Sequence, residues 1–201
     1  MQKSKQKLIE KKQQNNKEQI KVLIFHGWGS SNKDNWFPWL NKNLKKEDFI
    51  VNVPNLPNSR FPKLNKWLDC AFDLGINEKT ILVGHSLGSV LILRILEKLD
   101  FKLKAVFLVS TFDVDLGIDE IKNFVDKPFN YEKIKNNCEN IYILQSDNDK
   151  YIDLKIAENL TKKINAKLII FHNKDHLSQG TSIENNIYAF PELKELILSC
   201  K

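Results

Sequence analysis

The sequence predicts one compact α/β domain, built around a mostly parallel sheet of six strands with helices on its flanks. Three observations lead to this fold class. A length of 201 residues, of which 42% are hydrophobic, suffices for one domain with a sizeable core. Six short apolar runs, rich in β-branched and aromatic residues, are continuous rather than alternating, as in strands buried on both faces. Helical patterns separate these runs, which is typical of parallel strands joined by right-handed crossovers.

The first third of the chain supplies two strands and two helices. The runs IKVLIFH at 20–26 and FIVNV at 49–53 are the predicted strands. Between them, the tryptophans and leucines of 34–46 recur at helical spacing, and Pro38 falls near the first turn, where a helix tolerates proline. Leu, Trp and Ala residues of 61–72 repeat the helical spacing, which predicts a second helix.

The middle of the chain supplies two further strands, TILVG at 80–84 and KAVFLVS at 104–110. The helix predicted between them, 87–99, is so apolar that we expect it to pack centrally on the sheet. The next segment, 111–139, is long and irregular, and it leaves the sheet where ligands bind in parallel folds. It either shapes a pocket or is a crossover that only packs. We expect two short helices in it, at about 119–125 and 130–137.

The last third continues the alternation. NIYILQS at 140–146 and AKLIIFH at 166–172 are the fifth and sixth predicted strands. The segments 153–164 and 188–200 carry apolar residues at helical spacing and are the predicted helices. The sequence shows no internal repeat and no second domain.

The first residues, 1–19, differ in composition from the rest of the chain. They hold six lysines and two glutamates, so four of the six net positive charges of the protein lie here and the body, 20–201, is nearly neutral. A polar, basic segment of this kind is expected to be disordered. The basic balance therefore gives no reason to expect a nucleic-acid groove.

Three further patterns bear on location and cofactors. The tail lacks the apolar region of a secretory signal, and no run approaches the length of a membrane helix, so no membrane span is expected. Cys70, Cys138 and Cys200 are odd in number and lack CxxC spacing, which predicts reduced thiols in a cytoplasmic protein. The four histidines show no paired His/Cys spacing, so no structural zinc site is expected.

The segment Gly84-His85-Ser86-Leu87-Gly88 lies where a predicted strand ends and a predicted helix begins. A sharp strand-to-helix turn holds its central residue in a strained conformation and crowds the flanking backbone, so the two outer positions must be small. Glycines at both positions favour Ser86 as a catalytic nucleophile. The alternative is a glycine-rich loop with an incidental serine.

A nucleophilic serine needs a base and an acid that orients it, in the chain order Ser, Asp or Glu, His for this kind of sheet. Asp147 and Asp149 both follow the fifth strand, and their proximity alone does not separate them. Of two histidines that follow the sixth strand, His172 lies at the strand end, whereas His176 lies in a loop where an imidazole can reach the serine. We therefore expect His176 to be the base.

Two backbone amides are candidates for an oxyanion hole. Leu87 lies at a helix N-terminus, where its N–H points toward developing negative charge. In FHGWGSS at 25–31, the glycines allow a tight turn that aims the amide of Trp28 at the same place. His26 precedes the serine and is expected to hold this loop. The other tryptophans, Trp36, Trp39 and Trp67, have helical spacing and are expected to pack in the core rather than to form a substrate wall.

The chain resembles the small α/β-hydrolase family that includes the retinoblastoma-binding serine hydrolase and its bacterial relatives. The resemblance lies in the serine turn at 84–88, in the stretch FHGWGSSNKDNWFPWL and in the loops that carry Asp149 and His176. The resemblance covers about residues 20 to 200. It implies an α/β-hydrolase fold without a large lid. It also implies Ser86, Asp149 and His176 as the catalytic triad, with oxyanion amides from Trp28 and Leu87.

The sequence departs from this family at two positions. Asp175 stands immediately before the expected base, where relatives usually have glycine, and Asp153 stands where many α/β hydrolases have proline. Neither change removes a catalytic group.

The resulting expectation is a serine hydrolase of the carboxylesterase type that cleaves a small ester or a related acyl compound without a cofactor. The alternative is an interaction protein that keeps the hydrolase fold with little or no turnover. Transfer of the acyl group to an acceptor other than water would use the same residues. The expected partner is a small-molecule acyl substrate, and no feature of the sequence identifies a protein partner.

Overall fold

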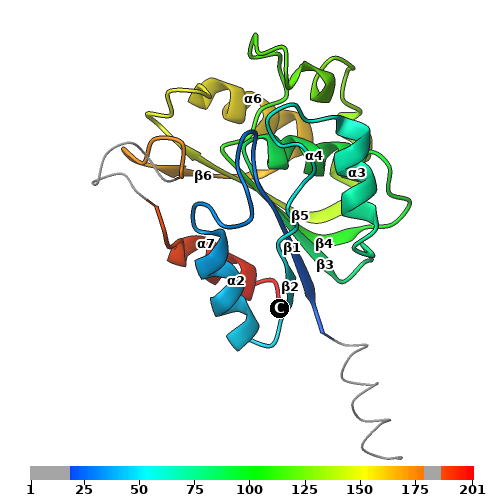
Figure 1. Ribbon diagram of the computed structural model, residues 1–201, viewed down its shortest axis with the longest axis vertical. Helices are drawn as coiled ribbons and strands as arrows, with labels where there is room; N and C mark the ends of the chain where they lie inside the picture. Colours follow the sequence, from blue (N-terminus) through cyan, green and yellow to red (C-terminus); the bar gives the residue numbers. More distant parts are fainter. Residues whose placement is uncertain (1–18, 179–186) are drawn as a thin grey trace, which may run out of the picture.

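The computed structural model describes residues 19–178 and 187–201 and contains one sheet with helices against both faces (Figure 1). The disordered tail expected at residues 1–19 lies outside the described residues except for Gln19. Residues 179–186 are not described either.

All six predicted strands form one sheet in the order β2-β1-β3-β4-β5-β6. Every neighbouring pair is parallel, so the sheet is fully parallel. The strand ends lie within two residues of the predicted ones. The strands are β1 Lys21–Phe25, β2 Ile50–Asn52, β3 Thr80–His85, β4 Leu103–Val109, β5 Cys138–Ser146 and β6 Lys167–Phe171.

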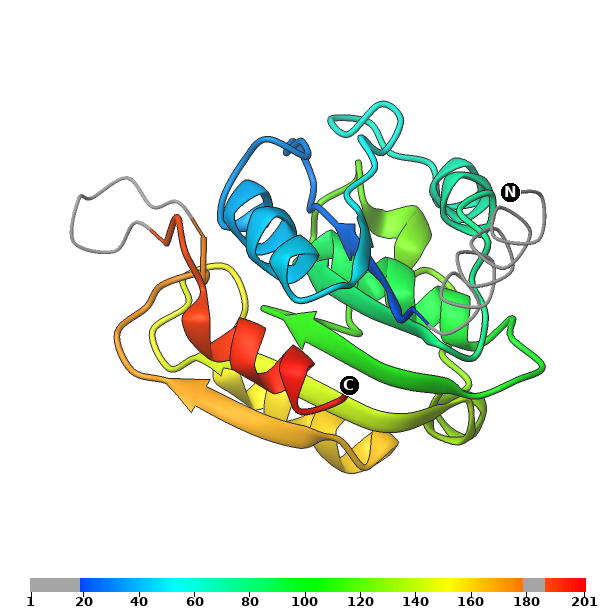
Figure 2. The same cartoon turned by 90° about the horizontal axis from the view of Figure 1, so that it is seen from below.

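The helices divide between the two faces of the sheet. On one face, Val22 and Ile24 of β1 belong to a buried cluster with α2 and α7, which lie side by side in Figures 1 and 2. On the other face, Leu23 and Phe25 belong to a cluster with α3, α4, α5 and α6. Because both faces are covered, the central strands are apolar throughout. The helices are α2 Phe37–Lys46, α3 Leu64–Phe72, α4 Leu87–Leu96, α5 Tyr131–Asn136, α6 Leu154–Ile164 and α7 Pro191–Leu198.

The segment between β4 and β5 is less helical than expected. The helix predicted at 119–125 is only a short 3₁₀ turn, η1 Lys122–Phe124, and the helix predicted at 130–137 is α5. The physical reason lies in Asn123. Its side-chain amide donates to the Glu120 carbonyl at 3.3 Å, the group that would accept from the Phe124 amide in an α-helix, and the Phe124 amide donates to the Ile121 carbonyl instead. Asn123 is held in this position because it also donates to the Pro62 carbonyl at 3.1 Å and accepts from the Leu64 amide at 2.8 Å.

Two of the three tryptophans predicted to pack in the core are buried there, and the third packs against it. Trp36 and Trp67 are fully buried, and Trp39 is half-buried against the same cluster as α2. Trp28, by contrast, is 42% exposed, as expected for a residue in a loop that borders a site. The three cysteines carry free thiols. Among the described residues, no helix is both long enough and apolar enough to cross a membrane.

Candidate active site

Ser86 lies in a strained turn between β3 and α4. Its backbone angles are φ 53° and ψ −121°, a conformation that residues other than glycine rarely adopt. The two flanking glycines make the turn possible. A Cβ atom on Gly84 would lie 2.5 Å from the Gly88 carbonyl oxygen, and a Cβ atom on Gly88 would collide with the carbonyl oxygens of Phe25 and His26. The local sequence therefore allows a sharp turn that points the Ser86 side chain away from the end of the sheet.

Ser86 opens into a cavity of about 430 Å³ at the carboxyl ends of the strands. The cavity is also lined by His176, Trp28 and Leu87, so four of the five residues predicted for the site meet there. The fifth, Asp149, lies behind His176. A cavity at this edge of a parallel sheet is where ligands bind in α/β folds.

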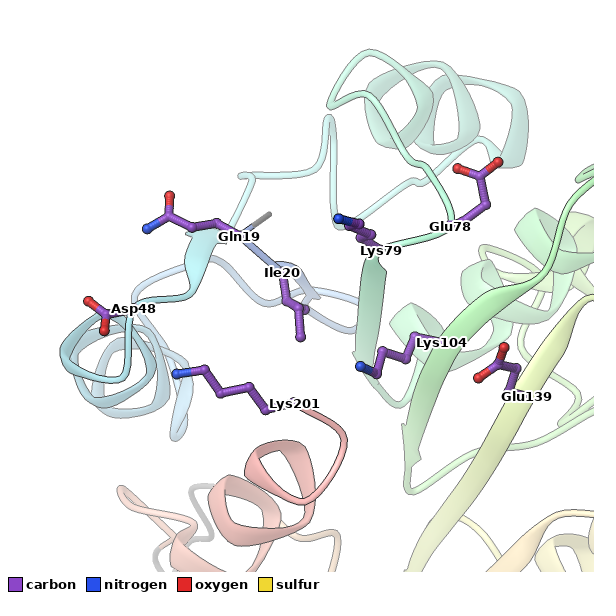
Figure 3. A pocket seen from close by; sticks show the side chains of 8 residues that line it. All are labelled: Gln19, Ile20, Asp48, Glu78, Lys79, Lys104, Glu139 and Lys201. Atoms are coloured by element: carbon purple, nitrogen blue, oxygen red, sulfur yellow. The ribbon is translucent and has the colours of Figure 1, made fainter. Parts of the chain in front are cut away.

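A larger cavity of about 860 Å³ lies at the opposite edge of the sheet, at the amino ends of the strands (Figure 3). It is an open depression lined by charges of both signs, including Lys104 and Glu139. Ser86 and His176 are not among its lining residues. The smaller cavity is therefore the candidate site.

The His176 imidazole is held by a buried carboxylate. Its Nδ1–H donates to Asp149 Oδ2 at 2.8 Å, and the Asp149 side chain has no exposed area. Burial acts to raise the pKa of Asp149, but hydrogen bonds from His176 and from the amides of Tyr151 and Ile152 outweigh it and lower the pKa. Asp149 is therefore ionised at neutral pH, and with the proton on Nδ1 the His176 Nε2 atom is available to accept a proton.

Asp147 has a different partner. Its carboxylate accepts from His172 Nδ1 at 2.7 Å and from the Asn173 amide at 2.9 Å, and both side chains of the pair are solvent-exposed. The structure thus separates the two aspartates: Asp149 pairs with the histidine in the cavity, and Asp147 pairs with the one outside it.

The Ser86 hydroxyl forms no hydrogen bond with another described residue, so no direct hydrogen bond joins Ser86 and His176 in this structure. Such bonds are often long in unliganded enzymes and shorten when substrate binds. Both groups line the same cavity, which brings the hydroxyl and the imidazole to one reaction volume.

Three side-chain hydrogen bonds hold the loop that carries Trp28. His26 donates from Nδ1 to the Gly27 carbonyl and accepts at Nε2 from the Leu56 amide, both at 2.9 Å, so its structural role is confirmed. The Trp28 indole donates to the Arg60 carbonyl at 2.8 Å. Among the described residues, neither the Trp28 nor the Leu87 amide donates to a backbone carbonyl outside the helices and strands, and Leu87, as the first residue of α4, has no acceptor within its helix. Both are therefore free to donate to an oxyanion.

Three buried polar side chains near the site were not predicted. Gln145 donates to Asp149 Oδ2 at 3.0 Å, and Ser110 and His85 both donate to the His176 carbonyl, at 3.1 Å and 2.9 Å. Gln145 is the last residue but one of the predicted strand 140–146, and Ser110 ends the predicted strand 104–110; a polar residue near the end of a buried strand was the available signal. His85 was visible only as the second residue of the serine motif.

The two departures from the family pattern have local explanations. Asp175 adopts φ 46°, in the left-handed region where glycine is favoured and aspartate is tolerated, and its carboxylate accepts from Asn148 at 3.0 Å. Asp153 is the N-cap of α6, where its side chain accepts from the Lys155 amide at 2.8 Å. Each aspartate thus supplies a contact suited to its backbone position.

Burial makes His85 sensitive to acid. Burial first, and the neighbouring His176 second, lower the pKa of His85 from 6.5 to about 3, against the opposing effects of the His176 carbonyl and of Asp149. The unfolded chain gains a proton on this residue below pH 6.5, whereas the folded protein excludes it until about pH 3. The stability that His85 contributes is therefore complete above pH 6.5 and is lost as the pH falls.

We expect the free energy of unfolding to fall with acidification in this window, by about 1.4 kcal/mol per pH unit for each excluded proton. Urea titrations of the wild type and of His85→Phe between pH 7 and 4 measure this. The variant lacks the titrating group, so its stability should fall less steeply, while His26 contributes equally to both proteins. Parallel curves for the two proteins would contradict the assignment.

The comparisons with known proteins agree on similarity to serine hydrolases. The sequence profile described as serine hydrolase matches residues 22–192. The chain is 32% identical over 160 residues to the YdeN protein of Bacillus subtilis, covering 77% of this chain and 84% of that protein. It is 29% identical over 159 residues to the serine hydrolase RBBP9 of Rattus norvegicus, with the same coverage. The crystal structure of the ydeN gene product covers 90% of this chain and 98% of its own, with a TM-score of 0.83 and 28% identity.

Proposed function

Because the chain belongs to the serine hydrolase family, we propose that it cleaves carboxylic esters with Ser86 as nucleophile, His176 as general base and Asp149 as the orienting acid. One observation carries this proposal. The strained serine shares a cavity with a histidine whose Nδ1 is 2.8 Å from a fully buried carboxylate. A conformationally strained nucleophile beside an oriented imidazole is the arrangement that acyl transfer to serine requires.

The reaction follows from this geometry. Ser86 Oγ attacks the ester carbonyl while His176 Nε2 takes the hydroxyl proton, and the Asp149 carboxylate stabilises the imidazolium that forms. The Trp28 and Leu87 amides donate to the oxyanion of the tetrahedral intermediate. The protonated imidazole then gives its proton to the leaving alcohol. Water enters by the same route, and its attack on the acyl-enzyme releases the acid and restores Ser86.

The lining of the cavity supports a substrate with an uncharged, apolar acyl group. One wall consists of Phe112, Leu116, Ile118 and Ile121 from the segment after β4, so that segment shapes the cavity as well as packing. Leu116 and Ile118 are half-buried, which leaves apolar surface for a ligand to cover.

The charges around the cavity support the same substrate class. No lysine or arginine is among the described residues that line it, and residues 179–186, which follow the lining residue Ser178, contain none in sequence. The lining carboxylate of Asp34 already accepts from Ser30 and Ser31. An anionic acyl group would therefore lose its hydration without gaining a cationic partner.

A series of 4-nitrophenyl esters from acetate to octanoate tests the proposal. We expect kcat/KM to rise about threefold for each added methylene until the cavity is filled. A hemisuccinate should react at least about tenfold more slowly than a neutral ester of similar length. Leu116→Trp should shorten the preferred chain, whereas Val114→Trp, an exposed neighbour that does not line the cavity, should not.

The rival function is binding without turnover. A fluorophosphonate probe separates the two, because it labels a serine only when the nucleophile is activated. Folded protein that neither hydrolyses any ester nor labels at Ser86 would reject the hydrolase and favour the interaction protein. Labelling with a flat chain-length profile would keep the hydrolase and reject the acyl preference.

The free cysteines support a reducing compartment, as expected for a cytoplasmic protein.

A further inference from the structure

The loop after β5 and the loop after β6 are joined residue by residue. Four consecutive residues, 146–149, each accept a hydrogen bond from one of four consecutive residues, 173–176. Three of the donors are backbone amides, and the last is the imidazole of His176. We name this set of four bonds the loop ladder. The bonds run from Asn173 N to Asp147 Oδ1 at 2.9 Å, from Lys174 N to Ser146 Oγ at 2.9 Å, from Asp175 N to Asn148 Oδ1 at 2.8 Å and from His176 Nδ1 to Asp149 Oδ2 at 2.8 Å.

Asn148 is at the centre of the ladder. Its Oδ1 also accepts from the Ser146 hydroxyl at 2.8 Å, and its Nδ2 donates to Asp175 Oδ1 at 3.0 Å. Asn148 and Asp175 thus exchange two hydrogen bonds, one to the backbone and one to the side chain. This pair stands immediately next to Asp149 and His176 in both loops, so it fixes the distance between the two backbones at that point.

The histidine loop needs such support because its backbone is strained. Asn173, Asp175 and Leu177 have φ angles of 55°, 46° and 47°, all in the left-handed region and none of them glycine. Conformations of this kind persist only where the surroundings impose them. On the far side of the loop, the Trp36 indole donates to the Leu177 carbonyl at 3.0 Å, while two donors bind the His176 carbonyl. The ladder is the restraint on the near side.

We propose that Asn148 is a positioning residue for His176, a role that rests on the proposed function of that histidine. By binding both the backbone and the side chain of Asp175, it holds the loop at the place where the imidazole meets Asp149 and faces Ser86. Asn148 touches no reacting atom. Its effect passes through the backbone of the histidine loop, and a displacement of about 1 Å there can cost about 10²-fold in rate.

Asn148→Ala tests the proposal, with Asn140→Ala as the matched control. Asn140 is an amide residue near the other end of β5, bound to the Lys104 carbonyl, and lies away from the histidine loop. We expect Asn148→Ala to lower kcat by about 10- to 100-fold while KM changes by less than about twofold. Asn140→Ala should change neither.

Exchanging the two side chains gives a rescue experiment. Asn148→Asp alone places two carboxylates face to face, so its kcat should be lowered, as that of Asn148→Ala should be. Asn148→Asp combined with Asp175→Asn restores one amide and one carboxylate in reversed positions. We expect the double variant to recover kcat to within about threefold of wild type, a coupling typical of residues in direct contact. Asp175→Asn alone completes the cycle.

Amide hydrogen exchange of Asn173, Lys174 and Asp175, followed by NMR, measures the ladder without turnover. Protection of these amides in the wild type and its loss in Asn148→Ala would support the ladder even if the protein hydrolysed no ester and the proposed function failed. Unchanged exchange in Asn148→Ala would overturn the proposal. In an active protein, it would also be overturned by Asn148→Ala with kcat within about twofold of wild type, or by a folded double variant without recovery.

Discussion

Replacement of Ser86 by alanine is expected to reduce ester hydrolysis by about 10⁵- to 10⁶-fold and to abolish labelling by a fluorophosphonate. The change removes the attacking oxygen and leaves the Trp28 and Leu87 amides, so only the contributions of binding and of the oxyanion site remain. Rates on the best ester of the chain-length series, with active-site titration by the probe, measure this. Activity within tenfold of wild type would reject Ser86 as the nucleophile.

The same position allows a control that does not depend on activity. Alanine keeps the side-chain strain at φ 53°, so Ser86→Ala should melt close to the wild type. Glycine relieves that strain, which is of the order of 1–3 kcal/mol, so Ser86→Gly should melt a few degrees higher while being equally inactive. A gain in stability with the loss of activity is the exchange expected where a strained conformation serves catalysis. A Ser86→Gly variant that melts below Ser86→Ala would contradict it.

The features predicted well from the sequence are those that short-range patterns determine. Continuous apolar runs located all six strands to within two residues, because both faces of the sheet are covered. The serine turn could be identified because its steric requirement falls on Gly84 and Gly88, two residues inside the same motif. In both cases, the physical cause and the sequence signal lie within a few residues of each other.

The features that were missed depend on contacts between distant segments. The helix expected at 119–125 is shorter because Asn123 binds the Glu120 carbonyl and is itself held by Pro62 and Leu64, about sixty residues earlier in the chain. Nothing in the loop after β6 announces that Asn148 will bind Asp175, because their register depends on how two neighbouring strands end. The choice between Asp147 and Asp149 depends on contacts of the same kind. Proximity alone left both open and the family resemblance favoured Asp149; in the structure Asp149 pairs with His176 and Asp147 with His172.

That assignment leads to the second large effect. Asp149→Asn is expected to lower kcat by about 10⁴-fold, because an amide Nδ2 facing His176 Nδ1 favours the tautomer whose Nε2 carries the proton. Such an imidazole cannot accept the Ser86 proton. The variant should still fold, since an asparagine Oδ1 can accept from the Tyr151 and Ile152 amides as the carboxylate does.

Asp147→Asn is the matched comparison in the same loop. Its Oδ1 can still accept from the Asn173 amide, so the ladder keeps its bond, and only the exposed pair with His172 is lost. An exposed ion pair contributes little, so kcat should stay within about threefold of wild type. Both variants are to be assayed at several pH values, with folding checked by circular dichroism. The Asp149 carboxylate fixes the tautomer of His176, whereas the Asp147 carboxylate binds only a loop amide and an exposed histidine. The losses of kcat in the two variants should therefore differ by about three orders of magnitude or more. If Asp147→Asn were the inactive variant, the base would have to be His172 outside the cavity, and the pairing of Asp149 with His176 could not be the catalytic one.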